Sequence, residues 1–157
     1  MESTTERIAV TRELVIDASP ETVWEFLVDP EKIVRWKGVD AVLQLWAGGA
    51  YRVAVVPPAH IAVGEVIECD PPRRLVHTWG WEGSDEVPPG STTVEYELQP
   101  EGDGTRLLFT HRDLPSKESA ESHTHGWDHY LPRLSVAAAG GDPGEDPWLT
   151  QDMQSAS

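Results

Sequence analysis

The stretch SKESAESHTHGWDHYLPRLSVAAAGG, residues 116–141, decides the fold. Ser116, followed by acidic residues in the next turn, is a typical helix start, and Gly140-Gly141 is a typical end. Four apolar residues between these signals follow the spacing i, i+4, i+7, i+11 and form one stripe: Trp127, Leu131, Leu134 and Ala138. The pattern predicts one long amphipathic helix, which Pro132 should kink or divide near Leu131.

The histidines of this stretch fall on two faces of the predicted helix. At about 100° per residue, His123 shares the apolar face with Trp127 and Tyr130. His125 and His129 lie on the opposite face, four residues apart, which is a spacing that can hold a metal ion. Because that face points away from any core, we interpret the pair as a solvated polar surface. We predict no functional metal site and no cofactor.

The residues before this helix predict an antiparallel sheet. Residues 8–17 alternate as a half-buried strand, and Ser19-Pro20 and Asp29-Pro30 each begin a short helix. Between residues 39 and 113, six strand-like runs are separated by Gly- and Pro-rich turns, including a hairpin turn at 101–104. We therefore predict an α+β fold in which a curved antiparallel sheet of about seven strands surrounds the long C-terminal helix, with two short helices after strand one.

Composition limits the possible functions. The 157 residues favour one domain over 8–140, with a disordered extension at 1–7 and a flexible acidic tail at 141–157, although docking of Trp148-Leu149 stays open. A net charge of −15 argues against nucleic acids and anionic membranes as partners. With no long apolar run and only one cysteine, Cys69, the chain is expected to be cytoplasmic and free of disulfides.

A sheet that curves around a single helix leaves a gap, which fills with large side chains or with a ligand. Strand parity places several aromatic and histidine side chains on the inner surface. The predicted ligand-binding residues are Trp36, Tyr51, Val53, His77, Trp79, Trp81, Phe109, His111, His123, Trp127, Tyr130 and Leu131. His111 and His123 are the candidates for a catalytic role as general base or in orienting a ligand.

Several segments together resemble a known family. These are ASPETVWEFLVDPEKIVRW, AGGAYRV, GEVIECDPPRRLVHTWGW, GTRLLFTHRDL and HGWDHYLPRL. Their order and spacing over roughly residues 8–138 resemble the SRPBCC (START-like, helix-grip) superfamily, in the bacterial branch named after the activator of heat shock protein 90 ATPase. The resemblance implies a helix-grip fold with a deep hydrophobic cavity that binds lipids, polyketides or other apolar small molecules.

The resemblance carries no shared catalytic motif, so the fold does not yield a reaction. We favour a protein, monomeric or homodimeric, that binds a hydrophobic ligand rather than an enzyme. One alternative is a cyclase or hydrolase that uses the cavity histidines. The other is a co-chaperone-like interaction module in which exposed Trp36 or Trp148 docks a partner.

Overall fold

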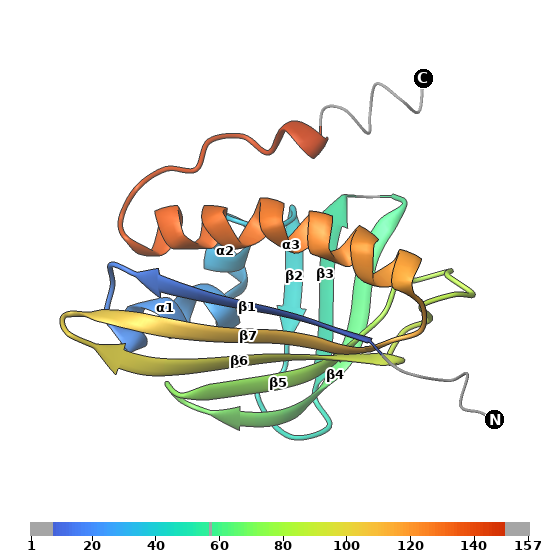
Figure 1. Ribbon diagram of the computed structural model, residues 1–157, viewed down its shortest axis with the longest axis horizontal. Coiled ribbons are helices and arrows are strands. Elements are labelled where there is room, and N and C mark those ends of the chain that lie inside the picture. The colour runs from blue at the N-terminus through green and yellow to red at the C-terminus, as the bar shows by residue number, and fades with distance from the viewer. Residues whose placement is uncertain (1–7, 57, 150–157) are drawn as a thin grey trace.

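The computed structural model describes residues 8–56 and 58–149, and it folds as one seven-stranded sheet with a long helix across it (Figure 1). All neighbouring strands are antiparallel, in the order β1-β7-β6-β5-β4-β3-β2. The strands are β1 (Ile8–Ile16), β2 (Asp40–Leu43), β3 (Ala50–Val56), β4 (His60–Asp70), β5 (Arg74–Trp79), β6 (Thr92–Glu101) and β7 (Gly104–Leu114). The predicted α+β helix-grip arrangement is confirmed.

The inner face of the sheet carries the side chains that strand parity selects. Leu75, His77 and Trp79 are buried on β5, and Phe109 and His111 are buried on β7. The β6–β7 hairpin turns at residues 101–104, where Glu101 pairs with Gly104 and Gly102 has a φ of 58°. Burial of alternate residues fixes the register, since a slip of one residue would turn these rings outward.

The two short helices close one end of the sheet. Helix α1 (Pro20–Val28) begins at Ser19, whose side chain accepts a hydrogen bond from the backbone N–H of Thr22. Helix α2 (Pro30–Ile33) begins at Asp29, which accepts from the N–H of Glu31. Both starts follow the predicted signals. The polar cap accepts from a free backbone N–H group, and the proline at the first helical position has no N–H that would need a partner.

Helix α3 (Lys117–Ala138) lies across the open face of the sheet (Figure 1). Ser116 caps it as predicted. The helix is continuous through Pro132, so of the kink or division predicted near Leu131 the division is wrong. Pro132 and Asp128 are both exposed, and water can therefore hydrate the Asp128 carbonyl that the proline leaves without a donor. Arg12 of β1 also donates to the Asp128 carboxylate at 2.7 and 3.1 Å.

Residues 141–149, named here the strap, fold back along α3 (Figure 1). A flexible tail was expected over 141–157; its last eight residues lie outside the described residues, whereas Asp146 of the strap is buried and residues 147–149 form a helical turn. Arg133 of α3 holds the strap by donating to the carbonyls of Pro143 and Gly144 at 3.1 and 2.9 Å. Within the described ranges, no helix is long and apolar enough to cross a membrane.

Candidate functional site

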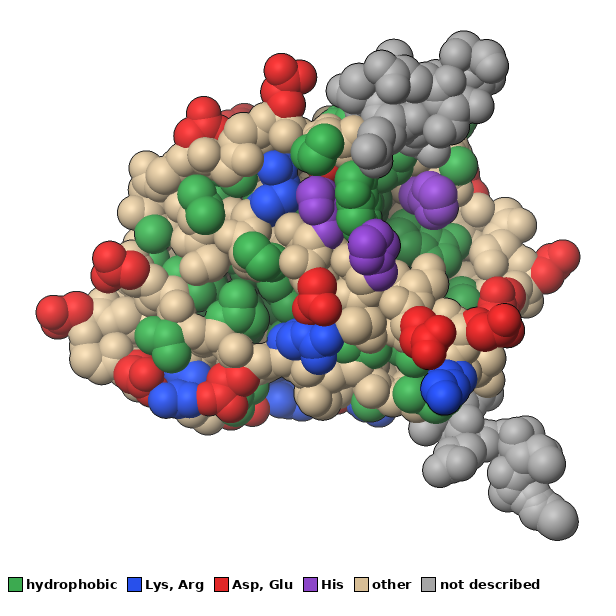
Figure 2. All heavy atoms as spheres, turned by 45° about the horizontal axis from the view of Figure 1, so that its top comes forward, with side chains coloured by type: hydrophobic (Ala, Val, Ile, Leu, Met, Phe, Trp, Pro, Cys, Tyr) green, Lys and Arg blue, Asp and Glu red, His purple; other side chains and the backbone are tan. Residues whose placement is uncertain are grey.

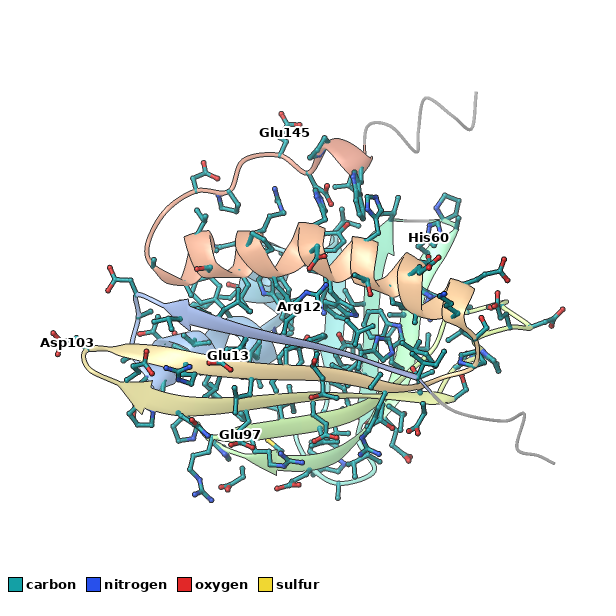
Figure 3. All side chains as sticks on the ribbon, in the orientation of Figure 1. Arg12, Glu13, His60, Glu97, Asp103 and Glu145 are labelled. Atoms are coloured by element: carbon teal, nitrogen blue, oxygen red, sulfur yellow. The ribbon has the colours of Figure 1, made fainter. Side chains whose placement is uncertain are left out.

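A cavity of about 410 Å³ lies between the N-terminal half of α3 and the inner face of β3–β5. Its volume is in the range of small-molecule sites. It is lined by Lys37, Val55, Val56, His60, Trp79, Trp81, Ser122, His123, His125, Gly126, Trp127, Tyr130 and Trp148. Figure 2 shows histidine side chains gathered beside apolar side chains on the face that carries α3. Figure 3 places His60 at the β3–β4 turn, on the side of the sheet where α3 lies.

The deepest polar group in the cavity wall is the amine of Lys37, whose residue is only 2% exposed. Its Nζ lies 3.0 Å from the Tyr51 hydroxyl oxygen. Four aromatic rings surround the amine, with their centroids 4.7 to 5.7 Å from Nζ: Trp36, Tyr51, Trp79 and Trp127. Within the described residues no carboxylate pairs with it. Lys37 is therefore a buried basic group without a counter-ion.

The chain places Lys37 here through the turn that follows α2. The N–H of Lys37 donates to the Ile33 carbonyl at 2.9 Å, and that of Val39 donates to the Ala54 carbonyl of β3 at 2.9 Å. Between them Gly38 has a φ of 86°, and a Cβ at this position would lie 2.6 Å from the Ala54 oxygen. Only glycine fits so close to the strand, so the turn is pressed against β3 and directs Lys37 inward.

Burial without an acidic partner sets the protonation of this amine. Desolvation lowers the pKa of Lys37 from 10.5 to about 7. The same desolvation raises the pKa of Tyr51 well above its ordinary value, so its hydroxyl keeps its proton at neutral pH. Lys37 is thus neutral in about half of the molecules near pH 7. A neutral amine can act as a nucleophile, whereas an ammonium group cannot.

His111 is held as one neutral tautomer by a hydrogen-bond network. Trp127 Nε1 donates to His111 Nδ1 at 3.0 Å, so Nδ1 carries no proton. Thr92 Oγ1 donates to the Trp79 carbonyl at 2.8 Å, so the 2.8 Å contact between Thr92 Oγ1 and His111 Nε2 is donated by the histidine. Burial lowers the pKa of His111 well below its ordinary value. Both ring nitrogens are therefore occupied inside the protein.

His123 is fixed in the opposite tautomer. Its Nδ1 donates to the Ser119 carbonyl at 2.8 Å, and its Nε2 accepts from Trp81 Nε1 at 3.1 Å. Burial lowers the pKa of this histidine too. The rings of His111 and His123 meet edge to face, with centroids 4.8 Å apart. Indole N–H groups thus donate hydrogen bonds to the basic nitrogens of both predicted catalytic histidines. Neither nitrogen is free to take a proton from a ligand.

The strap forms one wall of the cavity. The Trp148 ring stacks on that of His129, with centroids 3.8 Å apart, and lies 5.1 Å from that of His125. Asp146 accepts from Tyr130 Oη at 2.7 Å and contacts His129 Nε2 at 2.8 Å. The histidine pair does not simply face water as expected, because Trp148 stacks on it and His125 lines the cavity. Among the described residues, no three His, Cys, Asp or Glu side chains converge on a metal position.

The structure separates the predicted ligand-binding residues into two groups. Trp79, Trp81, His123, Trp127 and Tyr130 line the cavity. The others are packed in the core outside its lining: Trp36, Tyr51, Val53, His77, Phe109, His111 and Leu131. Those core residues fill the part of the gap between sheet and helix that the cavity does not occupy.

Trp36 and His77 illustrate why these core residues do not reach the cavity. Trp36 is 1% exposed and donates from Nε1 to the Phe26 carbonyl at 2.8 Å. His77 donates from Nδ1 to the Thr78 carbonyl at 2.8 Å and stacks on Tyr51 at 3.7 Å, and burial lowers the pKa of His77 to about 3. Both are held by local contacts within the core.

Sequence reasoning did not include eight lining residues in the predicted ligand-binding set: Lys37, Val55, Val56, His60, Ser122, His125, Gly126 and Trp148. Lys37 did carry a signal, because it is one of only three lysines and directly follows a tryptophan in a turn. Gly126 carried a second signal, since a glycine in a helix costs stability unless space or packing requires it. A Cβ added at Gly126 would meet nothing within 4 Å, so the cavity adjoins it.

The family model for activator of Hsp90 ATPase homolog 1-like proteins matches residues 17–139. None of the curated proteins matches the chain. Among solved structures, an AHSA1-like protein from Rhizobium etli is 45% identical, with 94% of this chain and 92% of that chain covered and a TM-score of 0.75. CalU16 from Micromonospora echinospora is 27% identical, with 98% and 96% covered and a TM-score of 0.67.

A third structure shows the same fold in a dimeric protein. The Aha1 dimer from Colwellia psychrerythraea has a TM-score of 0.73, with 85% of this chain and 98% of that chain covered. At 17% identity, this likeness extends to the fold alone.

Proposed function

The chain belongs to the family of activator of Hsp90 ATPase homolog 1-like proteins, and we propose that it binds an apolar, aromatic small molecule in the cavity between the sheet and α3. One observation carries the proposal. Four indole rings and one phenol ring are among the thirteen residues that line the cavity of about 410 Å³, together with a buried amine at Lys37. Ring faces favour planar apolar ligands, and one polar group is enough to orient them.

The alternative functions receive less support from this site. An enzyme that uses His111 or His123 as a base would need a free ring nitrogen, and both nitrogens of each ring are already paired. An interaction module that docks through Trp36 would need that ring at the surface, and it is buried. Trp148 is engaged with His129 on the same molecule.

Fluorescence titration with N-phenyl-1-naphthylamine, a neutral aromatic dye, tests the proposal. We expect saturable enhancement at one dye per chain. The Gly126→Phe variant should lower the affinity at least tenfold, because a ring at this position would enter the cavity. The matched control is Val136→Phe on the same helix, where the side chain is 44% exposed and outside the cavity lining. Equal affinities in Gly126→Phe and Val136→Phe, or no binding at all, would contradict it.

A further inference from the structure

Lys37 is the one buried charged side chain at the cavity whose role the proposed function leaves open. Lysine is almost never fully buried without a partner, since removing an ammonium group from water is costly. Here the amine sits at the cavity wall beside four aromatic rings and one hydroxyl, and no carboxylate of the described residues pairs with it. A fold that needed only apolar packing would be served better by a methionine or leucine at this position.

Resting on the proposed function, we infer that Lys37 captures an apolar, aromatic aldehyde or ketone in the cavity by reversible imine formation. The Nζ lone pair attacks the carbonyl carbon, and the carbonyl oxygen takes a proton to give a carbinolamine. Loss of the hydroxyl group with a proton from nitrogen forms the C=N bond and releases one water molecule. The step needs no oxidant, reductant or metal, and hydrolysis reverses it.

The surroundings of Nζ suit this chemistry in two ways. Because its pKa is about 7, a large share of Lys37 is the free amine at neutral pH, whereas ordinary lysines are almost entirely charged. The Tyr51 hydroxyl oxygen, 3.0 Å from Nζ, accepts a hydrogen bond from the amine and so orients it while leaving the nitrogen lone pair available. The indole rings of Trp79 and Trp127 form apolar walls beside the amine, which favours loss of water.

Reductive trapping tests the inference on the full chain. The protein is incubated with 6-methoxy-2-naphthaldehyde and sodium cyanoborohydride at pH 7, and labelled peptides are identified by mass spectrometry. We expect the label at Lys37 at least ten times faster than at Lys32 or Lys117. The rate at Lys37 should level off above pH 7, while the rates at the other two lysines keep rising.

Variants locate the reacting amine. Lys37→Arg keeps a cation but cannot form the imine, so the fast label should vanish, and Lys37→Met should behave alike if arginine disturbs folding. Lys32→Arg is the control and should keep the fast label. Tyr51→Phe should slow labelling without removing it. Equal labelling of all lysines, or a fast label that survives in Lys37→Met, would overturn the inference.

A ligand without a carbonyl separates this inference from cavity binding itself. 2-Methoxynaphthalene has the ring system of the aldehyde, and its binding is measured by quenching of tryptophan fluorescence. If it binds while the aldehyde is not trapped at Lys37, the imine inference is wrong and the proposed binding function stands. If neither molecule binds, both proposals fail.

Discussion

Single residues in this protein differ in whether their neighbours already occupy the atoms that could react with a ligand. His111 and His123 have the residue type expected of a base, yet an indole N–H occupies the basic nitrogen of each ring. Lys37 has no ionic partner among the described residues and one hydroxyl contact, so its amine keeps unused chemistry. Reactivity here follows from the hydrogen-bond partners of a side chain, and residue type alone does not reveal them.

The buried amine of Lys37 should make stability depend on pH. Its pKa is about 7 when folded and 10.5 ordinarily, so between these values the unfolded chain holds a proton that the folded chain lacks. The free energy of unfolding should therefore rise with pH, by about 2 kcal/mol from pH 7 to 9. The pKa values of His77 and His111 are lowered, so both rings are already neutral over this interval.

Urea unfolding at pH 7, 8 and 9 measures the slope of the free energy of unfolding against pH. In Lys37→Met the free energy of unfolding should change little between pH 7 and 9. At pH 7 this variant should be more stable than the wild type by about 2 kcal/mol, because an apolar side chain replaces an unpaired buried base. The control Lys117→Met, at an exposed position of α3, should keep the wild-type slope. A slope that persists in Lys37→Met would show that other groups cause it.

At the scale of elements, α3 serves two purposes along its length. Its C-terminal half presents Leu131 and Leu134 to the packed core, whereas its N-terminal half borders the cavity through Ser122, His123 and Gly126. The helix continues through Pro132 although the proline donates no hydrogen bond to the Asp128 carbonyl, because the affected turn faces water. The glycine leaves room at the point where a longer side chain would enter the cavity.

Gly126→Ala should stabilise the protein by about 0.5–1 kcal/mol. Alanine is the better helix former, and the added Cβ meets nothing within 4 Å. Thermal unfolding by circular dichroism measures the gain. The opposite outcome is expected for Gly64→Ala on β4, where a Cβ would lie 1.9 Å from the Thr78 oxygen. A loss of stability in Gly126→Ala would mean that the backbone at this turn requires glycine.

At the scale of the whole molecule, the cavity is bounded by segments from both ends of the sequence. The sheet supplies the inner wall, the turn after α2 supplies Lys37, and the strap adds Trp148. Besides the contacts of Arg133, one carboxylate of the strap binds α3. Burial raises the pKa of Asp146, but hydrogen bonds from Tyr130 and His129 outweigh this and leave the pKa below 3.8. Its stabilisation is therefore present above pH 3.8 and lost as the pH falls further.

Asp146→Asn should loosen the strap without unfolding the domain. The substitution removes the charge from the hydrogen bonds with Tyr130 and His129, at a cost of about 1–2 kcal/mol. Hydrogen exchange followed by mass spectrometry should show faster exchange in residues 142–149 and unchanged exchange in β6 and β7. The control is Glu145→Gln, because Glu145 points away from the domain (Figure 3). Equal exchange in the two variants would contradict this role for Asp146.

The sequence by itself determined the elements and the inner face of the sheet. Caps at Ser19, Asp29 and Ser116 and the alternation along β5 and β7 are local signals, and local backbone physics suffices to interpret them. The helical period likewise placed His123 on the face toward the sheet. The order of β2 to β7 followed because turns between successive strands leave an antiparallel meander as the natural order, whereas the place of β1 beside β7 did not follow from them.

Only the tertiary structure decided which inward residues pack and which border empty space. Trp36 and Lys37 are adjacent in an aperiodic turn, and the docking of that turn on β3 buries the first in the core and brings the second to the cavity. The strap has no periodic pattern, and its position depends on Asp146 meeting His129 and Tyr130. Such outcomes depend on contacts between residues far apart in the chain, which local propensity does not encode.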